Sequence, residues 1–175
     1  LYQAGDVPEA ESVVYGYAQL NAGKLAVRQS DLAAALSLAQ SSLTLLQRLG
    51  DKAGIAQVYL LLGSVARMKS EWAVAQQWGE EALALLREQS NKQGLLLALR
   101  HLGALAESQS NYAEARRLHE ASLEMARELG APGAIARSLS QLGSLAQQQG
   151  QYEQARTLYE QILAVYRQMG ARWHM

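Results

Sequence analysis

The chain has 175 residues, of which 49% are hydrophobic, and its longest apolar runs are far shorter than the roughly 18 residues a membrane span needs. Its 16 basic and 16 acidic residues cancel, so no overall charge draws it to nucleic acid or to a membrane surface. The absence of cysteine excludes disulfides and thiol chemistry and favours a reducing, cytoplasmic location.

The first part of the chain is predicted to form a helical hairpin. Asp6-Val7-Pro8-Glu9 has the composition of a helix start, with a capping Asp and a Pro suited to the first turn. Apolar residues then recur at helical spacing to about Gln29. After a break at Ser30-Asp31, a second helix is expected to extend to about Leu49 and to end at Gly50.

Three further hairpins follow, because the same residue pattern recurs every 40 positions. First helices are predicted over residues 52–69, 92–109 and 132–149, and second helices over residues 71–89, 111–129 and 151–169. The turns between them, at Ser70, Ser110 and Gly150, carry residue types that cap a helix or allow a left-handed backbone. Such short connections require antiparallel neighbours. We therefore expect a single domain over residues 1–175, with repeats at 11–50, 51–90, 91–130 and 131–170.

A glycine inside each first helix and an alanine in each second helix define the repeat. The glycines are Gly23, Gly63, Gly103 and Gly143, and the alanines are Ala35, Ala75, Ala115 and Ala155. Glycine inside a helix costs about 1 kcal/mol relative to alanine, so its recurrence indicates that the space of the missing side chain is needed. We expect the two helices of each hairpin to approach closely there. Bulky residues that open the second helices are expected to fill the gaps between hairpins: Leu32, Trp72, Tyr112 and Tyr152.

This spacing of Leu-Gly, then an aromatic residue, then Ala resembles the tetratricopeptide repeat, over residues from about 11 to 170. The repeats have 40 residues rather than the usual roughly 34, and Arg87, Arg127 and Arg167 continue the second helix where a Pro typically ends it. Longer repeats of this kind resemble those of kinesin light chains, Pins-type adaptors and bacterial signalling ATPases and regulators. The resemblance implies an all-α, right-handed superhelical solenoid of about four antiparallel hairpins that serves protein–protein interaction.

The sequence contains no motif for catalysis. A phosphate-binding glycine loop, a zinc-ligand spacing and a nucleophile motif are all absent, so we expect no enzyme, no cofactor and no metal. His101 and His119 are interpreted as surface or groove histidines. Glu80-Glu81 and Arg116-Arg117 are expected on solvent-facing turns of second helices. The three aspartates, Asp6, Asp31 and Asp51, each stand at a predicted helix start, where a capping role explains them.

The resemblance implies that the first helices line a concave groove, whose residues outside the hairpin core are candidates for binding a peptide. These candidates are Tyr17, Asn21, Lys24, Arg28, Gln57, Leu60, Ser64, Arg67, Leu97, Arg100, His101, Arg137, Ser140, Gln141 and Ser144. Five of them are basic, and Glu107 alone is acidic on the same face. Because the planar guanidinium of Arg matches the two oxygens of a carboxylate, the predicted ligand is an acidic peptide or helix. The alternative is that the basic side chains keep the groove soluble or pair with a neighbouring Glu.

The leading hypothesis is a protein–protein interaction scaffold within a larger signalling or regulatory protein, without a nucleic-acid or membrane partner. One alternative is a sensor array for a small effector or signalling peptide. Another is self-assembly into a homo-oligomer, because apolar residues of the last helix such as Ile162 and Tyr166 would be left bare without a following repeat. The chain opens on Leu1, and residues 171–175 stand where a next repeat would begin, so we expect a fragment of a longer array.

Overall fold

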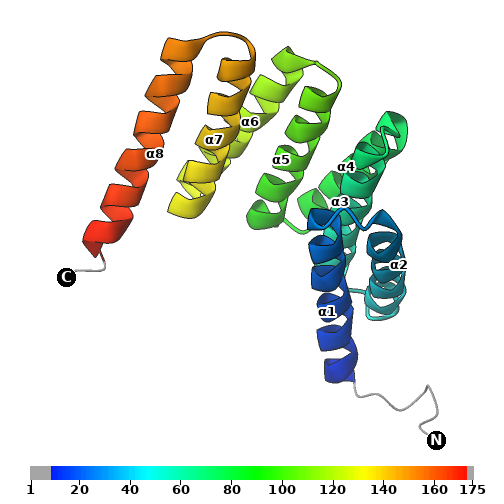
Figure 1. Ribbon diagram of the computed structural model, residues 1–175. Helices are drawn as coiled ribbons and strands as arrows, with labels where there is room; N and C mark the ends of the chain where they lie inside the picture. Colours follow the sequence, from blue (N-terminus) through cyan, green and yellow to red (C-terminus); the bar gives the residue numbers. More distant parts are fainter. Residues whose placement is uncertain (1–8, 173–175) are drawn as a thin grey trace, which may run out of the picture. The chain divides into compact units, whose positions relative to one another are not determined.

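The computed structural model describes residues 9–172, with the burial of side chains given for residues 12–170, and its regular structure there is entirely helical. The eight helices of this part are α1 (Glu9–Arg28), α2 (Leu32–Arg48), α3 (Lys52–Met68), α4 (Trp72–Glu88), α5 (Lys92–Ser108), α6 (Tyr112–Glu128), α7 (Pro132–Gln148) and α8 (Tyr152–Arg172) (Figure 1). The predicted all-α hairpin fold is therefore confirmed. The predicted helix start at Asp6-Val7-Pro8 lies outside the described residues.

A three-residue joint with a left-handed residue at its centre connects each helix to the next. These central residues are Ser30, Gly50, Ser70, Ser90, Ser110, Gly130 and Gly150, with φ between 51° and 72°. The amide after each centre donates to a carbonyl of the preceding helix, as from Asp31 N to Ala26 O at 2.9 Å, which satisfies a free helix end. Ser70 and Ser110 were predicted either to cap a helix or to adopt a left-handed backbone, and in the structure their backbone is left-handed.

The chain divides into two compact units, one up to Gly94 and one from Leu95 onward. The N-terminal unit contains α1 to α4 and the first residues of α5, and the C-terminal unit contains the rest of α5 with α6, α7 and α8. The boundary falls near the start of the third predicted repeat. A single right-handed superhelix through all four repeats stays a prediction.

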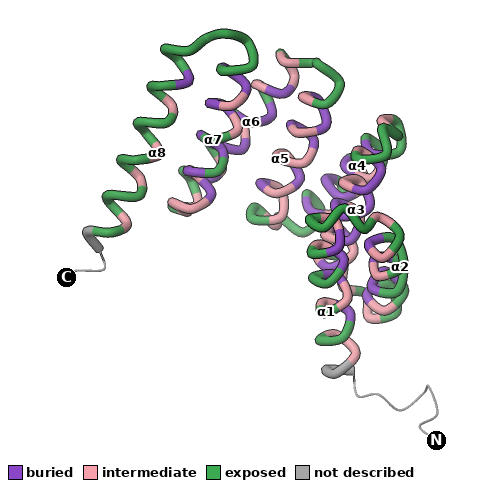
Figure 2. Tube along the Cα trace, viewed as in Figure 1, coloured by how far each residue is buried: buried purple, intermediate pink, exposed green. Residues whose placement is uncertain are grey.

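The core of the N-terminal unit lies where α2 and α3 pack together with α1. Its largest cluster consists of Leu20, Ala39, Leu43, Leu46, Val58, Leu61 and Leu62. The rings of Tyr59 and Trp78 flank this cluster with centroids 4.9 Å apart, a separation typical of attractive aromatic pairs. Buried residues thus recur along each of these helices, as the tube in Figure 2 shows.

In the C-terminal unit, α7 packs against both α6 and α8. One cluster joins Leu123 of α6 to Leu139 and Leu142 of α7, with Leu158 and Ile162 of α8 packed on it. The hydroxyls of Ser122 and Ser138, both fully buried, lie 2.9 Å apart and form a hydrogen bond between α6 and α7. Each serine therefore has a polar partner inside the core, as buried hydroxyls require.

Different groups face the repeated glycines, and at Gly23 the nearest is the Leu61 side chain of α3. In the N-terminal unit, a Cβ at Gly63 would lie 3.4 Å from the carbonyl oxygen of Ala75, so the predicted approach of backbones is confirmed there. In the C-terminal unit, a Cβ at Gly143 would lie 2.8 Å from the ring of Tyr159, and one at Gly103 would overlap the ring of His119. The missing side chains make room for rings in this unit.

The interpretation of His119 as a surface or groove residue is wrong. Its side chain is fully buried, and Nε2 lies 2.5 Å from Oε1 of Glu107, one helix away. Nδ1 is buried without a hydrogen-bond partner among the described residues. His119 occupies the position of Ala39 and Gly79 in the first two hairpins, which places it opposite the repeated glycine and hence inside the hairpin.

The carboxylate of Asp51 links two helices of the N-terminal unit, α1 and α3. Its Oδ1 accepts from the backbone amide of Gly54 at 2.9 Å and caps α3, while Oδ2 accepts from the Tyr17 hydroxyl of α1 at 2.8 Å. Burial raises the pKa of Tyr17 to about 12, helped by the hydrogen bond to Asp51 and by its charge. Asp31 makes only the capping bond, to the amide of Ala34 at 3.0 Å. The predicted capping roles of Asp31 and Asp51 are therefore confirmed.

We expect Asp51→Ala to lower the free energy of unfolding by about 2 kcal/mol, since it removes a cap and the partner of a half-buried hydroxyl. Asp31→Ala removes a cap alone and should cost about 1 kcal/mol. Urea unfolding of both variants measures the difference, and equal losses would contradict it. In Asp51→Ala the Tyr17 pKa should also fall toward its ordinary value, because an acceptor and a negative charge are gone. Ultraviolet titration against Tyr17→Phe identifies that tyrosine.

We expect Gly103→Ala to destabilise the protein by about 1–3 kcal/mol, because the added methyl overlaps the buried His119 ring. Gly143→Ala should cost far less, because Tyr159 is 38% exposed and its ring can move toward solvent. Both substitutions gain the same helix propensity, which makes them a matched pair. Thermal unfolding followed by circular dichroism separates them. A Gly143→Ala variant as unstable as Gly103→Ala would show that the exposed Tyr159 ring does not make room for the methyl group.

Candidate functional site

The predicted binding residues are partly or fully exposed, with one exception. The exposed ones are Asn21, Arg28, Arg137 and Ser140, and those of intermediate exposure are Tyr17, Lys24, Gln57, Ser64, Arg67, Leu97, Arg100, His101, Gln141 and Ser144. Leu60 is 2% exposed and belongs to the core of the N-terminal unit, so a partner has no access to it. The remaining residues are described for each unit separately, and we call them the first-helix face of that unit.

On the first-helix face of the N-terminal unit, several polar groups bond to one another. Lys24 of α1 donates to Oε1 of Gln57 on α3 at 2.9 Å, and burial lowers the pKa of Lys24. Tyr17 is held by Asp51, and the Ser64 hydroxyl donates to the carbonyl of Leu60 at 2.9 Å. These side chains tie α1 to α3, so part of the predicted binding set has a structural role.

On the first-helix face of the C-terminal unit, Arg100 of α5 and Arg137 of α7 bring two positive charges together. Arg100 is half-buried, and its Nε is fully shielded from solvent without a hydrogen-bond partner in the described part of the chain. Burial lowers the pKa of Arg100, and the positive charge of Arg137 lowers it further. The sequence analysis predicted both residues as basic groups of one face, and the structure brings them into electrostatic contact.

Arg100 stands at a position that the first two hairpins fill with leucine. Its equivalents by the 40-residue period are Leu20 and Leu60, which are 0% and 2% exposed. A guanidinium in such a place loses hydration, and a second guanidinium nearby repels it. The charge of Arg100 therefore stands in a less favourable environment than bulk water, with the charge of Arg137 nearby.

Glu107, the acidic residue expected on this face, does not neutralise the two arginines. Its carboxylate contacts the buried imidazole of His119 on α6, and the Glu107 side chain is 17% exposed. The separation of 12 residues along the chain does not indicate that Glu107 and His119 pair. Their places in the hairpin do indicate it, because His119 lies opposite Gly103, one helical turn from Glu107 on α5.

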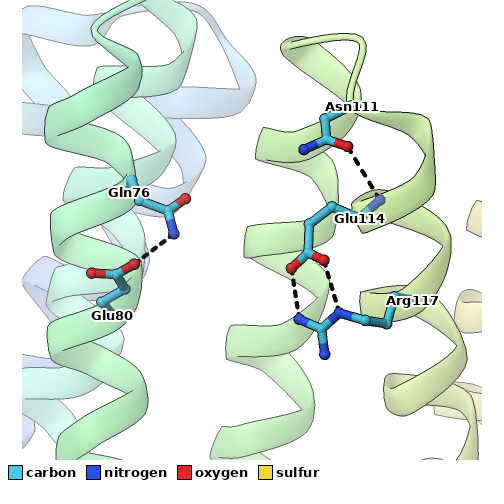
Figure 3. A network of polar contacts seen from close by, with 5 residues as sticks. All are labelled: Gln76, Glu80, Asn111, Glu114 and Arg117. Carbon is cyan, nitrogen blue, oxygen red and sulfur yellow. Dashed lines mark hydrogen bonds and ion pairs between the residues drawn. The ribbon is translucent and has the colours of Figure 1, made fainter.

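Charged groups on the second helices are paired locally instead. On α6 the guanidinium of Arg117 donates two bonds to the Glu114 carboxylate, at 2.8 and 2.6 Å, and lowers the pKa of that carboxyl (Figure 3). The amide of Glu114 in turn donates to the capping Asn111, and on α4 Gln76 donates to Glu80 at 2.7 Å. Glu80 and Arg117 are exposed, as predicted for solvent-facing turns, whereas Glu81 and Arg116 are of intermediate exposure. Arg100 and Arg137 have no such partner in the described residues.

Two further classes of site are absent from residues 9–172. No group of three or more His, Cys, Asp or Glu side chains lies close enough together there to hold a metal ion. Among the same residues, none of the helices combines the length and the apolar character needed to cross a bilayer.

Solved structures with the same fold include proteins of several kinds. BtubC (BKLC) from P. vanneervenii is 16% identical with a TM-score of 0.73, over 96% of this chain and 68% of that one. Aspartyl phosphate phosphatase F from Bacillus subtilis is 16% identical with a TM-score of 0.75, over 93% and 43%. A signal transduction ATPase with a tetratricopeptide repeat sensor from Pyrococcus horikoshii is 16% identical with a TM-score of 0.71, over 89% and 24%. At these identities the likeness shows the fold alone, and the chain spans only part of each protein.

No curated protein sequence matches the chain. The sequence model described as tetratricopeptide repeat matches residues 16–88 and 94–168, which together contain most of the chain and all four repeated glycines. Repeats of this type generally mediate protein–protein interaction. By this match, the chain belongs to the tetratricopeptide repeat family.

Proposed function

We propose that the chain is a protein-interaction module that holds an acidic segment of its partner on Arg100 and Arg137. The observation that carries the proposal is the half-buried guanidinium of Arg100, which has no hydrogen-bond or ion-pair partner in the described residues and lies near a second guanidinium. A carboxylate is the group that would pair with the accessible part of this guanidinium and offset the repulsion of the two charges.

The geometry of the guanidinium favours a carboxylate of Asp or Glu over a neutral acceptor. Arg presents its N–H groups in a planar fork that matches two carboxylate oxygens, and hydrogen bonds to charged groups contribute about 1.5–3 kcal/mol. Partial burial of Arg100 weakens screening by water and salt, so an acid bound there gains more than on an open surface. Exposed Ser140 and half-buried Leu97 lie on the same face and offer both a polar and an apolar contact to a peptide.

We further propose that the module is the recognition part of a larger regulatory protein. The Pyrococcus horikoshii ATPase supports this, because its tetratricopeptide repeats are described as a sensor and this chain covers 24% of its length. Recognition of a protein segment on one face and regulation by another part of the same polypeptide would be combined in such an arrangement.

The double variant Arg100→Ala with Arg137→Ala should weaken binding of an acidic peptide at least tenfold. Fluorescence anisotropy with a labelled peptide of alternating Glu and Ala measures this, and binding of the unmodified chain should weaken as salt is raised. Arg117→Ala is the matched control, because Arg117 is exposed and already paired with Glu114. Unchanged affinity in the double variant, or an equal loss in Arg117→Ala, would rule out the proposed site.

Arg100→Leu should stabilise the fold and abolish binding together. Leucine is the residue of the equivalent positions 20 and 60, and replacing a partly buried charge by a well-packed apolar group gains about 1 kcal/mol or more. Urea unfolding and the anisotropy assay on the same preparation test both effects. If Arg100→Leu unfolds more readily than the unmodified chain, Arg100 supports the fold and the argument for a binding role fails.

A further inference from the structure

The first helices of neighbouring hairpins meet along a seam, and in the N-terminal unit this seam joins α1 to α3. Its residues are Leu20, Lys24, Gln57 and Leu61, which we call the first-helix seam of that unit. Leu20 and Leu61 belong to one core cluster, and Lys24 donates to Oε1 of Gln57 at 2.9 Å. Each side chain of this seam therefore has a neighbour of matching chemistry.

In the C-terminal unit the same positions, two repeats further along the chain, hold residues of different chemistry. They are Arg100 and Ala104 of α5 and Arg137 and Gln141 of α7, in the places of Leu20, Lys24, Gln57 and Leu61. A guanidinium and an amide replace the apolar pair, and a methyl group replaces the lysine that bonds to the second helix of the seam. Arg100, Arg137 and Gln141 make no hydrogen bond or ion pair with other described residues. The first-helix seam of this unit is therefore polar and unmatched.

Neither helix offers a free acid to this seam. Helix α7 contains no Asp or Glu, and the only one on α5 is Glu107, whose carboxylate contacts the buried imidazole of His119. The charge of Arg137 lowers the pKa of Arg100, so the two guanidinium groups lie close enough to repel each other. Half-buried Arg100 is also less screened by water and salt than an exposed group. The seam thus presents two positive charges to a ligand.

Given the function proposed above, on which this step depends, we propose that the seam binds a phosphorylated serine or threonine of the partner's acidic segment. The phosphate would lie between the guanidinium groups of Arg100 and Arg137. A phosphate carries about −1.5 to −2 charges at pH 7, whereas a carboxylate carries one. A phosphate therefore balances both guanidinium groups, and a single carboxylate leaves one positive charge over.

The number and the place of the donors also suit a phosphate. Its oxygens can accept from both arginine side chains and from the amide of Gln141, and a planar guanidinium matches two phosphate oxygens. Ala104 keeps the space between Arg100 and Arg137 free of a long side chain, whereas the equivalent Lys24 reaches across to α3. Phosphorylation of the partner would thus switch binding on at this seam.

Three peptides that differ at one residue test the proposal on the whole chain. Each alternates Glu and Ala, and its central residue is serine, glutamate or phosphoserine. Fluorescence anisotropy should give the phosphoserine peptide an affinity about tenfold or more above that of the glutamate peptide, because a charge-assisted hydrogen bond to the second arginine contributes that factor. Inorganic phosphate at the concentration of the peptide should not displace it, because the free ion lacks the contacts of the flanking residues.

Two substitutions in the seam test where the phosphate binds. Arg137→Gln introduces the residue type of position 57 and should remove most of the preference for phosphoserine over glutamate, since one guanidinium is left. Ala104→Glu places a carboxylate between the arginines and should abolish binding of both peptides. Ala164→Glu is the matched control, because it adds the same charge at an exposed position of α8 whose equivalent on α6 is Glu124. Circular dichroism verifies that each variant folds.

The results distinguish the phosphate site from the acidic-segment function on which it depends. Equal affinity for the phosphoserine and glutamate peptides overturns the phosphate site and leaves that function intact, whereas no binding of any of the peptides overturns both. An unchanged preference in Arg137→Gln also overturns the phosphate site, as does binding by Ala104→Glu at the level of Ala164→Glu. Displacement of the peptide by inorganic phosphate would assign the seam to the free ion and equally contradict a phosphorylated partner.

Discussion

Close packing at the repeated glycine determines the geometry of every hairpin. The first helix omits a side chain there, and the group that faces the glycine ranges from the backbone of Ala75 to the rings of His119 and Tyr159. Because protein interiors tolerate neither voids nor overlap, the size of that group limits how closely the two helices pack.

Packing opposite the repeated glycine also bears on the charge of Arg100. Residue 100 stands at a position that is buried as leucine in the first two hairpins, and a ring rather than backbone faces the glycine of its own hairpin. His119 fills that space and also engages Glu107, so the nearest acid on α5 is directed into the hairpin. Interior packing thus leaves the charge of Arg100 and Arg137 without compensation, and a core contact bears directly on the proposed binding surface.

Local signals predicted the helices, the joints and the caps, because those depend on residues within a few positions of one another. Asp31 and Asp51 cap as expected, and Trp72, Tyr112 and Tyr152 open their helices as expected. Tyr152 is 68% exposed, however, so it does not fill a gap as predicted. Predictions that depend on several helices at once did less well. Leu60 was assigned to the binding surface because periodicity gives one buried face, whereas α3 is packed between α2 and α4 and buries a wider arc. The pairing of His119 with Glu107 depends on contacts between helices, which spacing along the chain does not encode.

The joints between helices have a consequence for how such a chain changes length. All joints have a length of three residues and a left-handed residue at the centre. This holds within hairpins, at Ser30, Ser70, Ser110 and Gly150, and between hairpins, at Gly50, Ser90 and Gly130. A duplication or deletion of 40 residues in the gene would therefore join the chain through a connection it already uses. The number of hairpins can change by recombination with no new backbone conformation, and natural selection then has only the packing surfaces to adjust.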